Sequence, residues 1–233
     1  LPAVVLAAER VNALYAFDAE DFHLGDLPAD SQSELQRNIV HEIQSSYLPG
    51  AAYVTAAAPG IAEAYEHEYA IRPIVVLNTF SKKLALDLPG PIEKGRETSV
   101  YWFSQTIGPN RGLECAIEAI SLADTRPHLY LRGNVGSVFR QTLVDIARKH
   151  SVVERVHFLD IASPAEMVSL CRQYDVGLAS ETGHTMNRQI ALTNKQFTYL
   201  LAGLPTLLSD IPAHVQFAEE AQGAAFLFRK DDA

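Results

Sequence analysis

The strongest constraint on the fold is the alternation of short apolar, β-type runs with helical patterns along most of the chain. In the second part, strands are predicted at 100–104, 128–132, 156–158, 176–179, 206–208 and 225–228. Helices are predicted between them, near 112–123, 137–150, 164–174, 194–202 and 212–221. Strands that alternate with helices form parallel sheets, because each crossover needs a long connection. We therefore predict a complete doubly wound, Rossmann-like α/β domain over residues 99–233.

The first part of the chain shows the same alternation with fewer strands. Strands are predicted at 14–17, 53–57 and 73–77, and helices near 2–13, 31–47 and 61–69. We predict a partial α/β domain over 1–80 whose opening strands are missing. Residues 81–98 contain Pro89-Gly90-Pro91 among charged residues and are predicted to be a linker. Because the chain starts at Leu1 and stops directly after a strand-like run, both ends are expected to be cut.

Composition and charge narrow the class of protein. The net charge of −9 and the pI near 5.3 argue against a surface that coats nucleic acid. The sequence has no run of eighteen apolar residues and no basic-then-apolar leader, and a targeting segment upstream of Leu1 stays open as an alternative. Because the two cysteines form no disulfide or metal pattern, a cytoplasmic protein is expected, with or without peripheral association with a membrane. Cys115 and Cys171 lie on apolar helical faces and are predicted to be reduced core residues.

The segment 191–210, ALTNKQFTYLLAGLPTLLSD, combines a helix and a buried strand. Thr193 and Asn194 are suited to cap the start of the helix, and Gly203 is suited to end it. Lys195 falls in the first helical turn, where the helix dipole disfavours a cation. An anion shared with the helix N-terminus, such as a phosphate, explains a lysine at this place.

The pattern NKxFxYLxAGLPxxxSD in this segment resembles the donor-nucleotide region of glycosyltransferases of the family 4 (group 1) type, which have the two-domain GT-B fold. The resemblance is divergent and strongest from about residue 100 to 232. It implies transfer of a hexose or related sugar from a nucleotide-sugar, with retention of anomeric configuration, no cofactor and no obligatory metal. It also implies a donor held by the C-terminal domain and an acceptor held by the N-terminal part, as in cell-surface polysaccharide biosynthesis.

A second candidate is the segment 104–113, SQTIGPNRGL, which follows a predicted strand and precedes a helix. Gly108 and Gly112 permit tight turns, and Arg111 at the helix start could clamp a diphosphate. A solvated arginine in an ordinary βα loop explains the spacing equally well. In the resembled family, a Gly-Arg…Lys-Gly segment neutralises the departing diphosphate. Arg111-Gly112 matches its second half, whereas the neutral Gln105 stands where the first cation is expected.

The short motif from Gly133 to Gly136 follows the next strand. It is a weak signal, and a structural turn is favoured over a ligand contact. By resemblance, Gly133 corresponds to the glycine that closes the second strand near the nucleobase, which gives it a supporting role in donor binding.

The loop 180–193 follows the strand predicted at 176–179 and carries Glu181 and His184. Both residues would lie at the carboxyl edge of the sheet, where open α/β sheets bind ligands. By resemblance, Glu181 contacts the donor sugar, and a second glutamate usually binds the ribose. Thr198 stands at the place of that second glutamate, seventeen residues after Glu181, and could offer one weaker hydrogen bond. Either the chain is a divergent transferase with Lys195 as an added phosphate ligand, or donor binding has been lost. We favour the first.

In the first part, residues 17–23 place three carboxylates and a histidine after a predicted strand. Such a group could form an acid/base cluster or a metal site, although a solvated loop with turn residues is an equal alternative. By resemblance, the segment faces the cleft between the domains, so Asp18, Asp21 and His23 are candidate acceptor-side residues. Asp21 and His23 are also catalytic candidates with Glu181, and His184 is an acceptor-side candidate.

The sequence therefore predicts a nucleotide-sugar-dependent glycosyltransferase acting on an unidentified glycan, lipid or small-molecule acceptor. The alternatives are a nucleotide-sugar epimerase on the same architecture and a non-catalytic nucleotide- or glycan-binding module. No metal, cofactor or nucleic acid is expected. Membrane contact is expected to run through the missing N-terminal part. These 233 residues alone are expected to be inactive.

Overall fold

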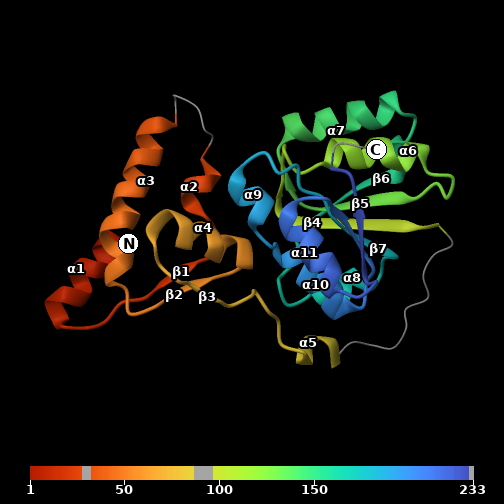
Figure 1. Cartoon of the computed structure of the whole chain (residues 1–233). Coiled ribbons are helices and arrows are strands. Elements are labelled where there is room, and N and C mark those ends of the chain that lie inside the picture. The colour runs from red at the N-terminus through yellow and green to blue at the C-terminus, as the bar shows by residue number, and fades with distance from the viewer. Residues whose placement is uncertain (28–32, 87–96, 231–233) are drawn as a thin grey trace. The chain divides into compact units, whose positions relative to one another are not determined.

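The computed structural model describes residues 1–27, 33–86 and 97–230. The chain divides into two compact units (Figure 1). Unit 1 consists of Leu1–Asn78 together with Gly183–Leu192, and unit 2 consists of Thr79–Thr182 together with Thr193–Ala233. Each unit contains a parallel sheet, so the α/β fold class predicted from the alternating pattern is confirmed.

Unit 2 is built on a six-stranded parallel sheet with the order β6-β5-β4-β7-β8-β9. The strands are β4 (Ser99–Ile107), β5 (His128–Val135), β6 (Val156–Leu159), β7 (Val176–Ala179), β8 (Thr206–Ser209) and β9 (Ala225–Phe228). The strand order reverses between β4 and β7, where an open α/β sheet has its topological switch point. Ligands of such sheets bind outside the carboxyl ends of the strands at that point.

The helices of unit 2 cover the sheet in two groups, as right-handed crossovers require. The first group is α6 (Leu113–Leu122) and α7 (Ser137–Lys149), and the second is α8 (Met167–Cys171), α10 (Asn194–Ala202) and α11 (Pro212–Glu220). Figure 1 shows α6 and α7 together on one side of the sheet. A short helix α5 (Lys83–Leu86) and the 3-10 turn η2 (Val153–Arg155) complete the unit.

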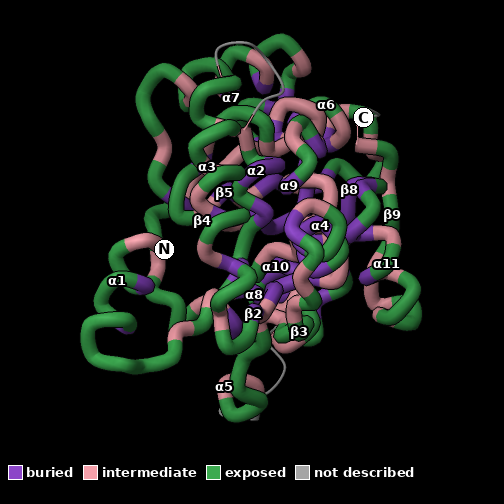
Figure 2. The backbone as a smooth tube through the Cα atoms, turned by 60° about the vertical axis from the view of Figure 1, so that its left-hand side comes forward, coloured by how far each residue is buried: buried purple, intermediate pink, exposed green. Residues whose placement is uncertain are grey.

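Unit 1 contains a three-stranded parallel sheet of β1 (Phe17–Ala19), β2 (Val54–Ala56) and β3 (Ile74–Val75). Its helices are α1 (Pro2–Val11), α2 (His23–Asp26), α3 (Glu34–Tyr47), α4 (Pro59–Tyr69) and α9 (Met186–Ile190), with the 3-10 turn η1 (Leu48–Gly50). The core lies between the sheet and α4, where Ile61 and Tyr65 are fully buried. In contrast, α1 is exposed along most of its length (Figure 2).

Most elements lie where the sequence predicts them, and the differences have local causes. β4 extends to Ile107, past an irregularity between Phe103 and Thr106, so the loop before α6 starts at Gly108 and not at Ser104. β1 begins three residues later than the predicted strand start at Leu14, which is exposed. The helices α2, α5 and α9 have four or five residues and were missed, because they are too short to show periodicity.

The domain boundaries differ from the predicted 1–80 and 99–233 in one respect. The segment Gly183–Leu192 groups with unit 1, although the sequence prediction kept it in the C-terminal domain. Of the predicted linker 81–98, residues 87–96 lie outside the described residues, and residues 83–86 form α5. The return of the chain to unit 1 leaves no compositional break that would mark it in the sequence.

Candidate functional site

The centre of the polar cluster in unit 2 is Glu181, directly after β7 at the carboxyl edge of the sheet. Its side chain is only 2% exposed, which is rare for a carboxylate unless it is paired. Glu181 Oε1 lies 3.4 Å from Arg111 Nη1 and 3.7 Å from Lys195 Nζ. One carboxylate therefore faces two cations that come from two different βα connections.

Lys195 lies in the first turn of α10, as the sequence predicts, and its side chain is 7% exposed. Its ammonium is 5.2 Å from the centroid of the Trp102 ring, within the range of a cation–π interaction. Trp102 lies on β4 and is fully buried. The Glu181 carboxylate and the Trp102 ring together account for a buried cation at a helix start, where the dipole opposes it.

Arg111 is held in place by the turn that starts α6. Ser180 Oγ donates a hydrogen bond to the Arg111 carbonyl oxygen at 2.6 Å. Gly112 has φ +67°, and a Cβ atom there would lie 3.0 Å from Ser180 Cβ. A glycine is therefore needed at 112 both for the backbone conformation and for the close approach of Ser180. The Arg111 side chain is 25% exposed, so it is the part of the cluster that solvent reaches.

Ser209 and His214 support Glu181 from the end of β8 and the start of α11. The Glu181 N–H donates to Ser209 Oγ at 2.9 Å, and His214 Nδ1 lies 2.9 Å from the Ser209 carbonyl oxygen. Burial lowers the pKa of His214 to about 4; the hydrogen bond to Ser209 and the charge of Glu181 act in the opposite direction, and Lys195 lowers it further. The imidazole is therefore neutral near pH 7. Sequence reasoning did not single out Ser209, although the pattern NKxFxYLxAGLPxxxSD includes it.

Thr198 lies 2% exposed on α10, and its hydroxyl donates to the Asn194 carbonyl oxygen at 2.8 Å. Its one proton is thus used within the helix, which leaves its oxygen as an acceptor for a ribose hydroxyl. A glutamate would also act as an acceptor there, so the weaker hydrogen bond from Thr198 stays a prediction. Asn194 begins α10 and is exposed, beside the buried Lys195.

The candidates Gln105, Gly108 and Gly133, on or next to β4 and β5, differ in exposure and backbone conformation. Gln105 is exposed within β4, and Gly108 begins the loop toward Arg111. Gly133 has φ +147°, and a Cβ atom there would lie 2.4 Å from the Ser104 carbonyl oxygen. The close approach of β5 to β4 thus explains Gly133, in keeping with the structural interpretation of its motif.

In unit 1, His23 takes part in a hydrogen-bond network with Tyr65, Gln44 and Tyr69. His23 Nδ1 lies 2.9 Å from Tyr65 Oη, and Gln44 Nε2 donates to the same hydroxyl at 3.0 Å. Tyr69 Oη donates to Gln44 Oε1 at 2.7 Å. Burial raises the pKa of Tyr65 to about 12, so its phenol keeps its proton. The network fixes one ring nitrogen of His23, and His23 itself remains exposed.

Asn187, on α9, holds the loop after β1 and was missed by the sequence reasoning. Its side chain is 1% exposed, accepts from the Phe22 N–H at 2.8 Å and donates to Asp21 Oδ1 at 2.8 Å. Asp21 is therefore linked to α9 and not to His23. Asp18 is exposed on β1 and accepts from Thr55 Oγ1 at 2.5 Å. The side chains of Asp18, Asp21 and His23 thus bond with different residues, although the Tyr65 hydroxyl also donates to the Asp21 carbonyl oxygen at 3.3 Å.

A cavity of about 580 Å³ lies within unit 1. Its wall includes the exposed side chains of His67, Glu63 and His184, and also Arg37, which donates to the Leu24 carbonyl oxygen at 3.1 Å. His23, Asp18 and Asp21 are not among the residues that line it. Of the predicted acceptor-side residues, His184 is the one that this cavity includes.

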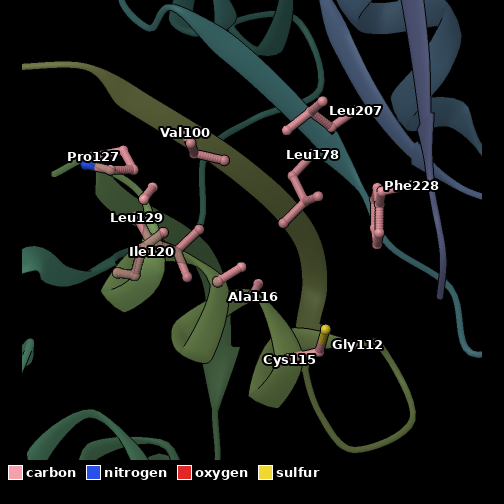
Figure 3. Close-up of a pocket in the computed structure, with 12 residues that line it drawn as sticks. Val100, Gly112, Cys115, Ala116, Ile120, Pro127, Leu129, Leu178, Leu207 and Phe228 are labelled. Carbon is pink, nitrogen blue, oxygen red and sulfur yellow. The ribbon is translucent and has the colours of Figure 1, made fainter. Parts of the chain in front are cut away.

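A second cavity, of about 230 Å³, lies in unit 2 and is almost entirely apolar (Figure 3). Figure 3 shows Leu178, Leu207 and Phe228 from three strands, opposite Cys115 and Ile120 of α6. The cavity contains none of Arg111, Glu181 or Lys195, so it is separate from the charged cluster. Cys171 is buried in the core, as predicted, whereas Cys115 is only half-buried.

The described residues also bear on whether the chain has a metal site or a membrane-spanning helix. Among residues 1–27, 33–86 and 97–230, no group of three or more His, Cys, Asp or Glu side chains has the arrangement of a metal site. In the same part of the chain, no helix is both long and apolar enough to cross a membrane.

Comparison with solved structures identifies the fold. HepE from Anabaena, solved with UDP, has a TM-score of 0.72 at 16% identity over 97% of this chain and 61% of HepE. Sucrose-phosphate synthase from Thermosynechococcus elongatus has a TM-score of 0.70 at 16% identity, over 94% of this chain and 56% of its own. A glycosyltransferase from Rickettsia africae has a TM-score of 0.71 at 10% identity, over 99% and 66%. No protein-family model and no curated protein matches the sequence.

These likenesses show the fold of GT-B glycosyltransferases, as the sequence resemblance implied. At identities of 10–16%, they show the fold alone. The chain spans less than two thirds of the length of HepE and of the synthase.

Proposed function

We propose that this chain belongs to a nucleotide-sugar-dependent glycosyltransferase and that unit 2 binds the donor. The observation that carries the proposal is the cluster of Arg111, Glu181 and Lys195 at the carboxyl edge of the sheet. Two cations and helix starts at that edge suit a diphosphate. HepE, a neighbour with the same fold, has been solved with UDP and with UDP-glucose.

In the proposed reaction, a hexose or related sugar leaves the diphosphate and joins an acceptor hydroxyl. Arg111, Lys195 and the start of α10 would stabilise the negative charge that grows on the departing diphosphate. Glu181 would orient the sugar. We propose retention of configuration and no requirement for a metal, with two protein cations in the place that a divalent ion takes elsewhere.

The acceptor belongs to unit 1 in this proposal. The cavity of about 580 Å³ offers His67, His184 and the carboxylate of Glu63, which suit the hydroxyl groups of a glycan or small polyol. His23 and Asp21 remain candidates for proton transfer, with His23 oriented by Tyr65.

A second candidate, a non-catalytic nucleotide-binding module, is favoured by one observation. Thr198 stands at the place of the ribose-binding glutamate, and its hydroxyl, which donates to the Asn194 carbonyl oxygen, leaves only one neutral oxygen as an acceptor. A site without that glutamate would hold a nucleotide more weakly, since a bidentate charged acceptor is replaced by a neutral one.

Calorimetric titration with UDP, GDP and CMP tests donor binding. We expect one of these nucleotides to bind the unmodified chain and Lys195→Ala to weaken that binding about tenfold or more, because a buried phosphate contact is lost. Lys149→Ala removes an exposed lysine of the same unit and should change nothing. Equal nucleotide affinity in Lys195→Ala and Lys149→Ala would show that Lys195 has a purely structural role. Sugar release or transfer assays with the nucleotide-sugar of the preferred base then separate the enzyme from the binding module.

A further inference from the structure

In this structure, Glu181 is the resident counter-ion of the cations assigned to the donor diphosphate. Its Oε1 atom lies 3.4 Å from Arg111 Nη1 and 3.7 Å from Lys195 Nζ. Glu181 and Lys195 are both less than a tenth exposed. The carboxylate thus takes the position relative to the two cations that a phosphate oxygen would take.

A diphosphate and the Glu181 carboxylate cannot share these two cations without a cost. The three side chains together carry one net positive charge, whereas the two cations alone carry two. A phosphate that enters next to a buried carboxylate is repelled strongly, because the local dielectric constant is low. Binding of the diphosphate therefore requires the Glu181 side chain to leave at least one cation.

The backbone at Glu181 limits how this exchange takes place. The Glu181 N–H donates to Ser209 Oγ at 2.9 Å, and Ser209 is in turn in contact with the buried His214. Only the side chain is left to move. A carboxylate that has lost two cationic partners needs new hydrogen-bond donors, since a buried acceptor without a donor costs free energy.

A nucleotide-sugar can supply those donors, but a free nucleoside diphosphate cannot. The hydroxyl groups of the sugar can donate to the displaced carboxylate. The free nucleoside diphosphate instead ends in a phosphate monoester, which gains a further negative charge above about pH 6. The same carboxylate would thus accept hydrogen bonds from one ligand and repel the other.

We infer that Glu181 determines specificity by making the site prefer a nucleotide-sugar over the free nucleoside diphosphate. Its carboxylate leaves Arg111 or Lys195 when the diphosphate binds, and it then accepts hydrogen bonds from the hydroxyl groups of the sugar. The inference rests on the proposed donor site. In a transferase, this preference favours loading of the donor and release of the spent nucleotide, which lacks the sugar.

The test compares the affinities of UDP and UDP-glucose for the full chain and for Glu181→Gln. We expect Glu181→Gln to bind UDP about tenfold more tightly than the unmodified chain, with no comparable gain for UDP-glucose. Glu118→Gln makes the same change of charge at an exposed position of α6 and should leave both affinities unchanged. Unchanged or weaker UDP binding by Glu181→Gln would overturn the inference while leaving the proposed donor site intact. If the unmodified chain binds neither UDP nor UDP-glucose and none of the other nucleotides titrated above, both the inference and the proposed donor site are overturned.

A second variant covers the case in which Glu181→Gln fails to fold because Lys195 has lost its partner. The double change Glu181→Gln with Lys195→Met restores one net positive charge from Arg111. We expect UDP affinity within about threefold of the unmodified chain, with the preference for UDP-glucose lost. A double variant that keeps the original preference would show that Glu181 does not set it.

Discussion

The polar clusters of the two units bury different kinds of group. In unit 2, Glu181 and Lys195 are charged and less than a tenth exposed. In unit 1, the buried members, Tyr65, Gln44 and Asn187, are neutral, and the ionisable candidates Asp21 and His23 are exposed. A buried charge depends on its partner far more than a neutral hydrogen-bonded group does. Substitutions in unit 2 should therefore have larger effects than matched substitutions in unit 1.

The largest effect is expected from Lys195→Met, which removes the cation from the buried pair and so tests the difference between the two units. We expect the free energy of unfolding of unit 2 to fall by about 3 kcal/mol, because Glu181 is left buried with one charged partner fewer. Chemical denaturation followed by the fluorescence of Trp102, the only tryptophan, reports on this unit. Lys149→Met, at an exposed position, serves as the control; equal losses in the two variants would contradict the prediction.

Acid should also weaken unit 2 selectively. The pKa of His214 is about 4 in the folded chain and returns to about 6.5 on unfolding. The unfolded state therefore binds the extra proton between these values, and stability falls as the pH drops from 6.5 toward 4, by up to about 3 kcal/mol. His214→Asn, which retains a hydrogen-bond donor, should flatten this part of the stability profile. If the loss of stability between pH 6.5 and 4 persists in His214→Asn, it comes from other titrating groups.

The largest effect expected in unit 1 comes from Asn187→Ala. It removes an acceptor for the buried Phe22 N–H and a donor to Asp21, for a loss of about 2 kcal/mol in the opening of the loop after β1. Hydrogen exchange at the Phe22 amide measures this opening directly. Asn194→Ala changes an exposed asparagine of unit 2 and should leave exchange at Phe22 unaltered.

The smallest effect is expected from Tyr65→Phe, which keeps the buried ring and removes its hydroxyl. Gln44 retains its bond with Tyr69, so the expected loss is about 1 kcal/mol. Chemical denaturation measures this loss, which follows because the Tyr65 hydroxyl no longer bonds with His23 and Gln44. Tyr53→Phe, at an exposed tyrosine, is the matched control. A loss above that of Asn187→Ala would contradict the ranking.

The sequence predicted the fold well because the signals for it are local. Helix α10 has its predicted bounds, since a cap residue, periodic apolar residues and Gly203 lie within ten positions. The pairing of Glu181 with Lys195 and Arg111 depends on β7, α10 and α6 meeting at one sheet edge. The predicted topology places these three elements at one sheet edge, but it does not predict which anion lies beside Lys195. The sequence pointed to a phosphate, and the structure shows a carboxylate.

The part of the site that sequence reasoning missed depends on contacts between distant residues. Asn187 bonds to Asp21 across 166 positions, and nothing in the spacing of either residue indicates the other. Likewise, the hydrogen bond from the Thr198 hydroxyl to the Asn194 carbonyl oxygen depends on the side-chain rotamer of Thr198, which residue identity alone does not determine.

The return of Gly183–Leu192 to unit 1 also has a consequence for the order in which the chain matures during synthesis. The Phe22 amide finds its acceptor only when Asn187 has been translated, which is after residues 79–182 of unit 2 have been made. Closing so long a loop is entropically costly and slow. Unit 1 thus precedes unit 2 in the chain but cannot be completed until most of unit 2 has been synthesised.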